Sequence, residues 1–83
     1  WLPRVQHETG NGSVAAYDLV NVVENTHYDG VLAFRNGQAL KKVSVPSDLS
    51  EYKIDFNGGS SKTRITLGGN LPSTEQLIVW YIA

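Results

Sequence analysis

The stretch Glu51-Tyr52-Lys53-Ile54-Asp55-Phe56 alternates charged and apolar side chains at every position. Successive side chains of a β-strand point to opposite faces of the sheet, so Tyr52, Ile54 and Phe56 share one face. The charged residues take the other face. A strand with one buried and one wet side is typical of an antiparallel sheet, and the stretch therefore predicts a layered, all-β fold.

The residues after this strand predict its hairpin partner. Residues 63–67 repeat the alternation, with Ile65 and Leu67 on the inward face. Residues 57–61 contain an asparagine and two glycines and would form a connecting loop longer than a two-residue turn.

A second hairpin is predicted upstream, around Asn36-Gly37. An Asn-Gly pair between apolar runs is the strongest local hairpin signal, because both residues tolerate the positive φ of a tight turn. Residues 31–35 and 39–45 would be its strands. Pro46 would end the second strand, since proline has no N–H for a ladder.

Residues 14–23 admit two interpretations. Their two alanines and Leu19 would permit a helix, whereas four valines and Tyr17 favour a strand. We predict a strand over residues 14–20, with Tyr17 and Leu19 inward, and a loop over residues 24–28.

Short strands separated by Gly- and Asn-rich turns are typical of a sandwich or a small barrel. We predict one all-β domain over residues 1–83, a small antiparallel β-sandwich, immunoglobulin-like or related, of about six or seven strands. The inward side chains would be Tyr17, Leu19, Tyr52, Ile54, Phe56, Ile65, Leu67, Val79 and Tyr81. The sequence has no methionine, which we expect of a processed product or a piece of a longer chain.

The last predicted strand, residues 76–82, is apolar on both faces. One face can close the domain's own core, and the other, with Ile78, Trp80 and Ile82, must also leave water. We predict that this second face, together with Trp1, is an interface with another protein, because a terminal strand is often a sheet edge. The alternative is a central strand whose outer face is covered by the segment that contains Trp1.

Composition excludes several classes of function. Seven Lys and Arg against eight Asp and Glu give a net charge of −1, which argues against a dedicated nucleic-acid binder, since such a protein would show a basic face. No apolar run approaches the length of a membrane span, so we expect no membrane insertion. Cysteine is absent, which excludes disulfides and thiolate metal ligands.

Few residues could carry chemistry. Residues 10–15 loosely match the dinucleotide-binding pattern G-x-G-x-x-A, but that motif needs a strand before it and a helix after it, so a turn is the better interpretation. His7 and His27 are the only histidines, and no serine lies in a G-x-S-x-G sequence. We therefore predict a protein that is not an enzyme, with no catalytic residues, no cofactor and no metal.

Several motifs follow one another in an order that is moderately specific. They are Glu8–Ser13, Gly30–Gln38, Glu51-Tyr52, Arg64–Leu67 and Leu77–Ile82. In this order they resemble a small β-sandwich module of tailed-bacteriophage virion proteins, with its T-G-[DN]-G-S turn, Asn-Gly hairpin, [DE]-Y strand and I-T-[FL] strand. The match covers nearly the whole chain, although residues 40–50 and 57–62 are longer than the connections of the module.

The resemblance implies a structural role in the phage particle, as a tail-fibre, head-fibre or capsid-decoration domain. The partners would be other virion proteins or copies of the chain itself, a trimer by analogy with phage fibres.

A carbohydrate-binding module for attachment to a host-surface glycan is the alternative function. Outward-facing aromatic rings can stack on sugars, and Tyr28 is the candidate ligand-facing aromatic, beside Trp1 and Trp80. A shared flat patch of such rings would support this hypothesis. A third hypothesis is a sandwich that serves only as a spacer beside an enzyme.

Overall fold

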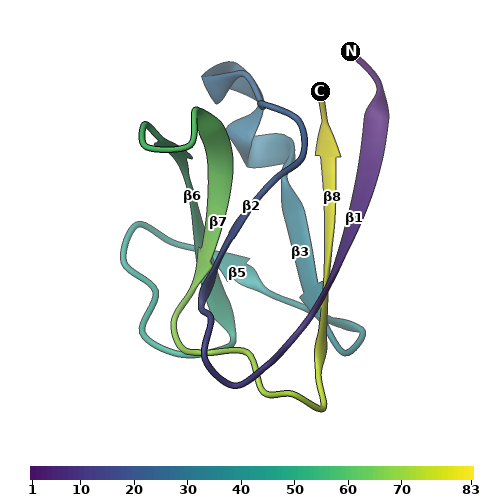
Figure 1. Cartoon of the computed structure of the whole chain (residues 1–83). Helices are drawn as coiled ribbons and strands as arrows, with labels where there is room; N and C mark the ends of the chain where they lie inside the picture. Colours follow the sequence, from purple (N-terminus) through teal and green to yellow (C-terminus); the bar gives the residue numbers. More distant parts are fainter.

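Strand pairing in the computed structural model, which describes residues 1–83, produces two four-stranded sheets that face each other (Figure 1). The strands are β1 (Pro3–Thr9), β2 (Ala16–Asp18), β3 (Leu32–Arg35), β4 (Gln38–Ala39), β5 (Lys41–Lys42), β6 (Glu51–Asn57), β7 (Lys62–Leu67) and β8 (Gln76–Ile82). Sheet A has the order β1-β8-β3-β4, and sheet B has the order β2-β7-β6-β5. All pairs are antiparallel except β5 with β6. The predicted all-β sandwich is confirmed, with eight strands.

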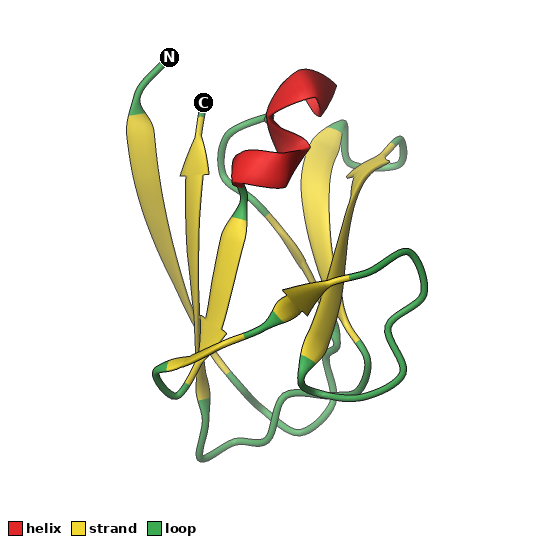
Figure 2. Cartoon of the chain, turned by 180° about the vertical axis from the view of Figure 1, so that it is seen from behind, coloured by secondary structure: helices red, strands yellow, loops and turns green.

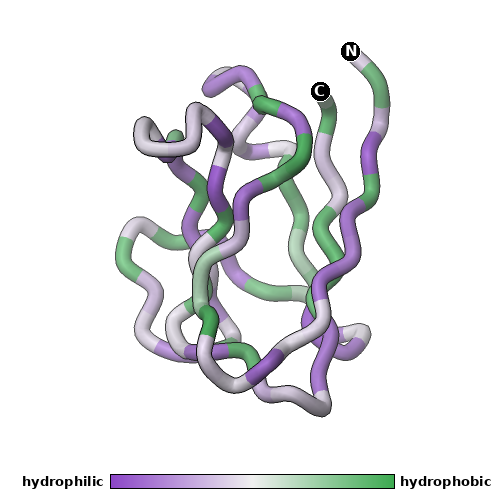
Figure 3. The backbone as a smooth tube through the Cα atoms, viewed as in Figure 1, coloured by the Kyte–Doolittle hydropathy of each residue, from purple (hydrophilic) through white to green (hydrophobic).

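The core lies between the two sheets, where the apolar positions of the alternating strands meet. Figure 3 colours the backbone by hydropathy, and hydrophobic and hydrophilic residues follow one another closely along much of it. The buried apolar side chains are Leu19, Val23, Val31, Ala33, Tyr52, Ile65, Leu67, Leu71, Leu77, Val79 and Tyr81. Because most of them come from opposed strands of different sheets, closing the core requires both sheets at once.

Three of the predicted core residues lie nearer the surface. Tyr17 and Ile54 are half-buried and pack against the core, and Phe56 has 54% of its surface exposed. The inward register is as predicted, since Ile54 lies opposite Ile65 and Phe56 opposite the buried Thr63. However, β5 pairs with β6 only at its first two residues, so the rest of β6 is an uncovered sheet edge.

The predicted second strand of the upstream hairpin, residues 39–45, is divided between the sheets. Its first part, β4, pairs with β3 across the Asn36-Gly37 turn, and its continuation, β5, runs parallel to β6 in sheet B. The chain changes sheets at Leu40, whose partly buried side chain packs against the core. The predicted continuous strand is therefore interrupted at Leu40, where the chain passes from sheet A to sheet B.

The ambiguous stretch forms less strand than predicted. Only Ala16–Asp18 pairs with β7, and a short 3₁₀ helix, η1 (Asn25–Gly30), replaces the loop predicted over residues 24–28. This helix lies at one end of the sandwich, between the sheets (Figure 2). After β2 the chain leaves the ladder, so that Leu19 and Val23 can enter the core.

The first strand, β1, is the element that the sequence did not predict. Its inward positions, which lie opposite the buried residues of β8, are polar: Arg4, Gln6 and Glu8. The Gln6 side chain joins the edges of the two sheets, because its Nε2 donates to the Asp18 carbonyl at 3.1 Å and its Oε1 accepts from Val20 N at 2.9 Å. Polar inward residues hide this strand from a search for apolar alternation.

Candidate interaction surface

The outer face of sheet B is polar and paired across its strands. Asp18 and Asp55 lie on either side of Arg64 in the register of β2, β7 and β6. Arg64 Nε donates to Asp18 Oδ1 at 2.9 Å, and Lys53 Nζ lies 3.5 Å from Asp55 Oδ2. The hydrogen bond from Arg64 is the main reason why the pKa of Asp18 lies below its ordinary value. Such a face is suited to water rather than to an apolar partner.

The outer face of sheet A is apolar across three strands. Val5 of β1 and Leu32 of β3 lie directly opposite Trp80 of β8, on its two sides. Side chains directly opposite one another in neighbouring strands are about 4.5–5.5 Å apart at Cβ, so the three form one row. Ile78 and Ile82 extend the row along β8.

We call this surface, made of Val5, Leu32, Ile78, Trp80 and Ile82, the apolar strip. Its side chains are far from covered: 51% of Trp80, 51% of Leu32, 47% of Val5 and 37% of Ile82 is exposed. Single exposed apolar residues are normal on a protein surface, whereas a contiguous group marks an interaction site. The strip is therefore a candidate interaction surface.

The structure brings three of the predicted interface residues together and separates the fourth. Ile78, Trp80 and Ile82 share the outer face of β8, as predicted, but β8 is a central strand and not an edge. Trp1 is 80% exposed and its ring meets His27 edge to face, with centroids 4.4 Å apart. The alternative in which the Trp1 segment covers this face does not occur, because Trp80 remains half exposed.

Two members of the strip were not predicted from the sequence. Val5 lies on the unpredicted strand β1, and Leu32 lies in a predicted strand to which no face was assigned. The apolar run Val31–Phe34 was the available signal for Leu32, since alternation places it opposite the buried neighbours Val31 and Ala33. The strip becomes visible only when the register of three strands is known.

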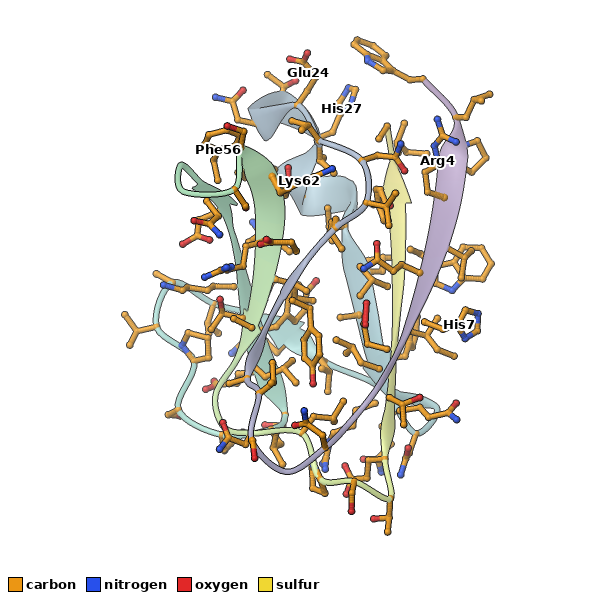
Figure 4. The ribbon with its side chains drawn as sticks, viewed as in Figure 1. Arg4, His7, Glu24, His27, Phe56 and Lys62 are labelled. Carbon is orange, nitrogen blue, oxygen red and sulfur yellow. The ribbon has the colours of Figure 1, made fainter.

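The remaining aromatic and histidine residues are dispersed. Tyr28, the candidate ligand-facing aromatic, belongs to η1, where it is half-buried and packs against the core. Trp1 precedes β1, and Trp80 projects from β8, so the three rings come from three segments. His7 points away from the sandwich on β1, and His27 lies in η1 (Figure 4). No three His, Asp or Glu side chains are close enough to hold a metal ion.

Three open hollows lie on the surface, and only the third touches the apolar strip, through Val5. The largest, of about 520 Å³, adjoins the uncovered edge of β6 and is lined by Lys42, Val43, Ser44, Lys53, Ile54 and Asp55. The second, of about 480 Å³, lies beside Arg35 and Asp48, and the third, of about 380 Å³, lies between β1 and Val20. No histidine lines any of them.

Comparisons with family models, with curated proteins and with solved structures find no match to this chain. No helix of the structure is both long enough and apolar enough to cross a membrane. The apolar strip is accordingly the feature from which a function can be argued.

Proposed function

We propose that this chain is a non-enzymatic structural module of a bacteriophage virion, which acts by docking the outer face of sheet A against other subunits of the particle. The observation that carries the proposal is the apolar strip, centred on Trp80. The choice of a phage particle rests on the motifs that resemble, in their order along the chain, a module of phage virion proteins. The partners are other virion proteins or copies of the chain itself, with a trimer the expected form by analogy with phage fibres.

The contrast between the two outer faces supports docking through sheet A in particular. Sheet B carries one ion pair between β2 and β7 and another within β6, whose charges would lose hydration in a contact. Sheet A presents a row of a valine, a tryptophan and a leucine, which carries no charge and only one polar group, the indole N–H of Trp80. Tryptophan is also the residue type most enriched among those that dominate binding energy at interfaces.

Replacing Trp80 with lysine tests the proposal. A lysine in the middle of the strip would have to lose its hydration on docking, so we expect Trp80→Lys to remain folded and to lose the assembly that forms through the strip. Sedimentation velocity over a range of concentrations measures the assembly, and circular dichroism measures the fold. The chain mass of 9.1 kDa gives the monomer reference.

Thr66→Lys is the matched control, because Thr66 is a half-exposed residue of β7 on the outer face of sheet B. It adds the same side chain on the opposite side of the sandwich, and we expect assembly as in the wild type. If Trp80→Lys assembled like the wild type, or unfolded a chain that was monomeric before the change, Trp80 would not be an interface residue and the proposal would be wrong.

A further inference from the structure

Strand β1 is the outermost strand of sheet A along its whole length of seven residues. It has β8 on one side and no strand on the other (Figure 1). Leu2 and Ala83 exchange two backbone hydrogen bonds of 3.0 Å, which fixes the phase of the antiparallel ladder. The backbone N–H and C=O groups at every second position from Leu2, which are those of Arg4, Gln6 and Glu8, therefore point toward β8. The residues whose backbone groups point away from β8 are Pro3, Val5, His7 and Thr9.

The free edge thus offers a row of unpaired N–H and C=O groups, which is a template for another extended strand. Pro3 lacks an N–H, but Val5, His7 and Thr9 each keep a donor. None of these three amides has a hydrogen-bond partner in a turn, a loop or a side chain. This edge is suited to another extended strand, and the side chains of β1 indicate which one.

The inward side chains of β1 carry opposite charges at equal distances from Gln6. Arg4 lies two residues before it and Glu8 two residues after it. Inward charges on an edge strand normally repel a passing apolar strand. Here both charged groups also keep free hydrogen-bonding atoms. Arg4 donates only through Nε, to the Ala83 carbonyl, and Glu8 accepts only through Oε2, from Gln6.

We propose that β1 pairs antiparallel with β1 of a second copy of this chain, in the register that places the two Gln6 residues opposite each other. In this register each Arg4 lies opposite Glu8 of the other copy, so two opposite-charge pairs form across the new ladder. The two four-stranded sheets A become one continuous sheet. The proposal does not rest on the virion function, because it uses the edge of the sheet and not its face.

Other registers lose this complementarity. A shift of two residues in either direction places Gln6 opposite Arg4 or opposite Glu8, and no opposite-charge pair remains. A parallel arrangement brings each charge close to its own copy, which is unfavourable. The charges therefore select one partner and one register, and they reject the unrelated apolar strands that an open edge would otherwise attract.

The first test uses the wild-type chain alone. Hydrogen exchange measured residue by residue reports whether the amides of Val5, His7 and Thr9 have partners. We expect their exchange to slow as the protein concentration rises, while the amides of Arg4, Gln6 and Glu8, which already bond to β8, stay protected throughout. Fast exchange of the three outward amides at every concentration would overturn the proposal.

The second test is a charge exchange between copies. We expect Arg4→Glu and Glu8→Arg, each alone, to weaken self-association by about tenfold, since each places like charges opposite one another. An equimolar mixture of the two variants should restore pairing as a heterodimer, because every position then faces an opposite charge. Native mass spectrometry distinguishes the species once one variant carries a mass label. Variants that pair as the wild type does, or a mixture that fails to restore pairing between folded chains, would contradict the proposed register.

A proline exchange separates this edge from the apolar strip. His7→Pro removes an outward N–H and leaves the β1–β8 ladder intact, so we expect a folded chain that has lost edge pairing. Gln6→Pro removes a ladder N–H and is expected to destabilise the fold. Trp80→Lys should keep the concentration-dependent protection of the three outward amides even where docking through the strip is lost. Failure of the edge proposal and failure of the proposed function therefore give different results.

Discussion

Thr63 shows how one polar side chain can organise a segment of this fold. It is fully buried in β7, and its Oγ1 accepts a hydrogen bond of 2.8 Å from Val23 N. Its backbone carbonyl also accepts from Leu19 N at 2.7 Å. The chain after β2 is thus held against β7 at two points, although it is no longer part of the ladder. Buried polar groups need such partners, so the hydroxyl at this position is structural.

Replacing Thr63 with valine keeps the shape and removes the hydroxyl. We expect Thr63→Val to lower the free energy of unfolding by about 1–3 kcal/mol, because the buried N–H of Val23 loses its partner. Urea denaturation measures the change. Thr66→Val, on the half-exposed outer face of the same strand, should change stability by no more than about 0.5 kcal/mol. Equal effects of the two substitutions would show that the Thr63 hydroxyl contributes nothing.

Among the elements, β2 and β7 owe part of their pairing to charge. Asp18 accepts from Arg64 Nε at 2.9 Å across the two strands, and Asn57 Nδ2 lies 3.4 Å from the same oxygen. The hydrogen bond from Arg64 is the largest of the causes that hold the pKa of Asp18 below its ordinary value of 3.8. A carboxyl group whose folded pKa is lowered stabilises the fold above its unfolded pKa and loses that contribution as the pH falls.

The lowered pKa of Asp18 predicts how the stability of an Asp18→Asn variant depends on pH. We expect it to be less stable than the wild type at pH 7. The difference should shrink as the pH falls below 3.8, where Asp18 of the unfolded chain takes up a proton, and should be lost once the pH passes the lowered pKa of folded Asp18. Thermal unfolding at a series of pH values measures the difference. In an Arg64→Met background the effect of Asp18→Asn should largely disappear, as a double-mutant cycle would show. A difference that is constant with pH would exclude the ion pair as its cause.

At the scale of the whole molecule, the two ends of the chain lie side by side. Leu2 and Ala83 bond to each other in both directions, at 3.0 Å, and the N- and C-termini lie at the same end of the sandwich (Figure 1). The loop between β6 and β7 lies at this end too, and Gly58 packs against nothing that an added side chain would touch. Chain ends that adjoin each other tolerate being joined when new ends open in an exposed loop.

We therefore expect a circular permutant to fold. A short Gly/Ser linker would join Ala83 to Trp1, with new ends between Gly58 and Gly59. Far-UV circular dichroism should show the β-sheet spectrum of the parent chain, and heating should give one cooperative transition. A permutant opened between Val79 and Trp80 is the control, and it should not fold, because β8 is central in sheet A. Folding of both permutants, or of neither, would contradict this account of the topology.

The two surfaces of sheet A point in different directions, which matters for assembly. The apolar strip faces outward from the sheet, whereas the free edge of β1 lies in the plane of the sheet. Occupation of one surface therefore leaves the other open. Val5 belongs to both, since its side chain lies in the strip and its backbone N–H lies on the edge.

The all-β class and the strands whose signal is local follow from the amino-acid pattern alone. The alternation of β6 and β7 and the two-faced apolar character of β8 are properties of single segments, and each strand lies within two residues of its predicted position. The Asn36-Gly37 turn was equally visible, because both residues adopt positive φ there. Side-chain periodicity is sufficient for these features, since a strand alternates whatever its neighbours are.

The neighbours of each strand are known only from the folded structure. It showed that β8 is central, that the chain changes sheets at Leu40, and that β1, with its polar inward residues, completes sheet A. It also left Phe56 exposed, because no strand covers that part of β6. The physical reason is that the exposure of a side chain depends on residues far away in the chain. The apolar strip, drawn from β1, β3 and β8, therefore exists only after folding.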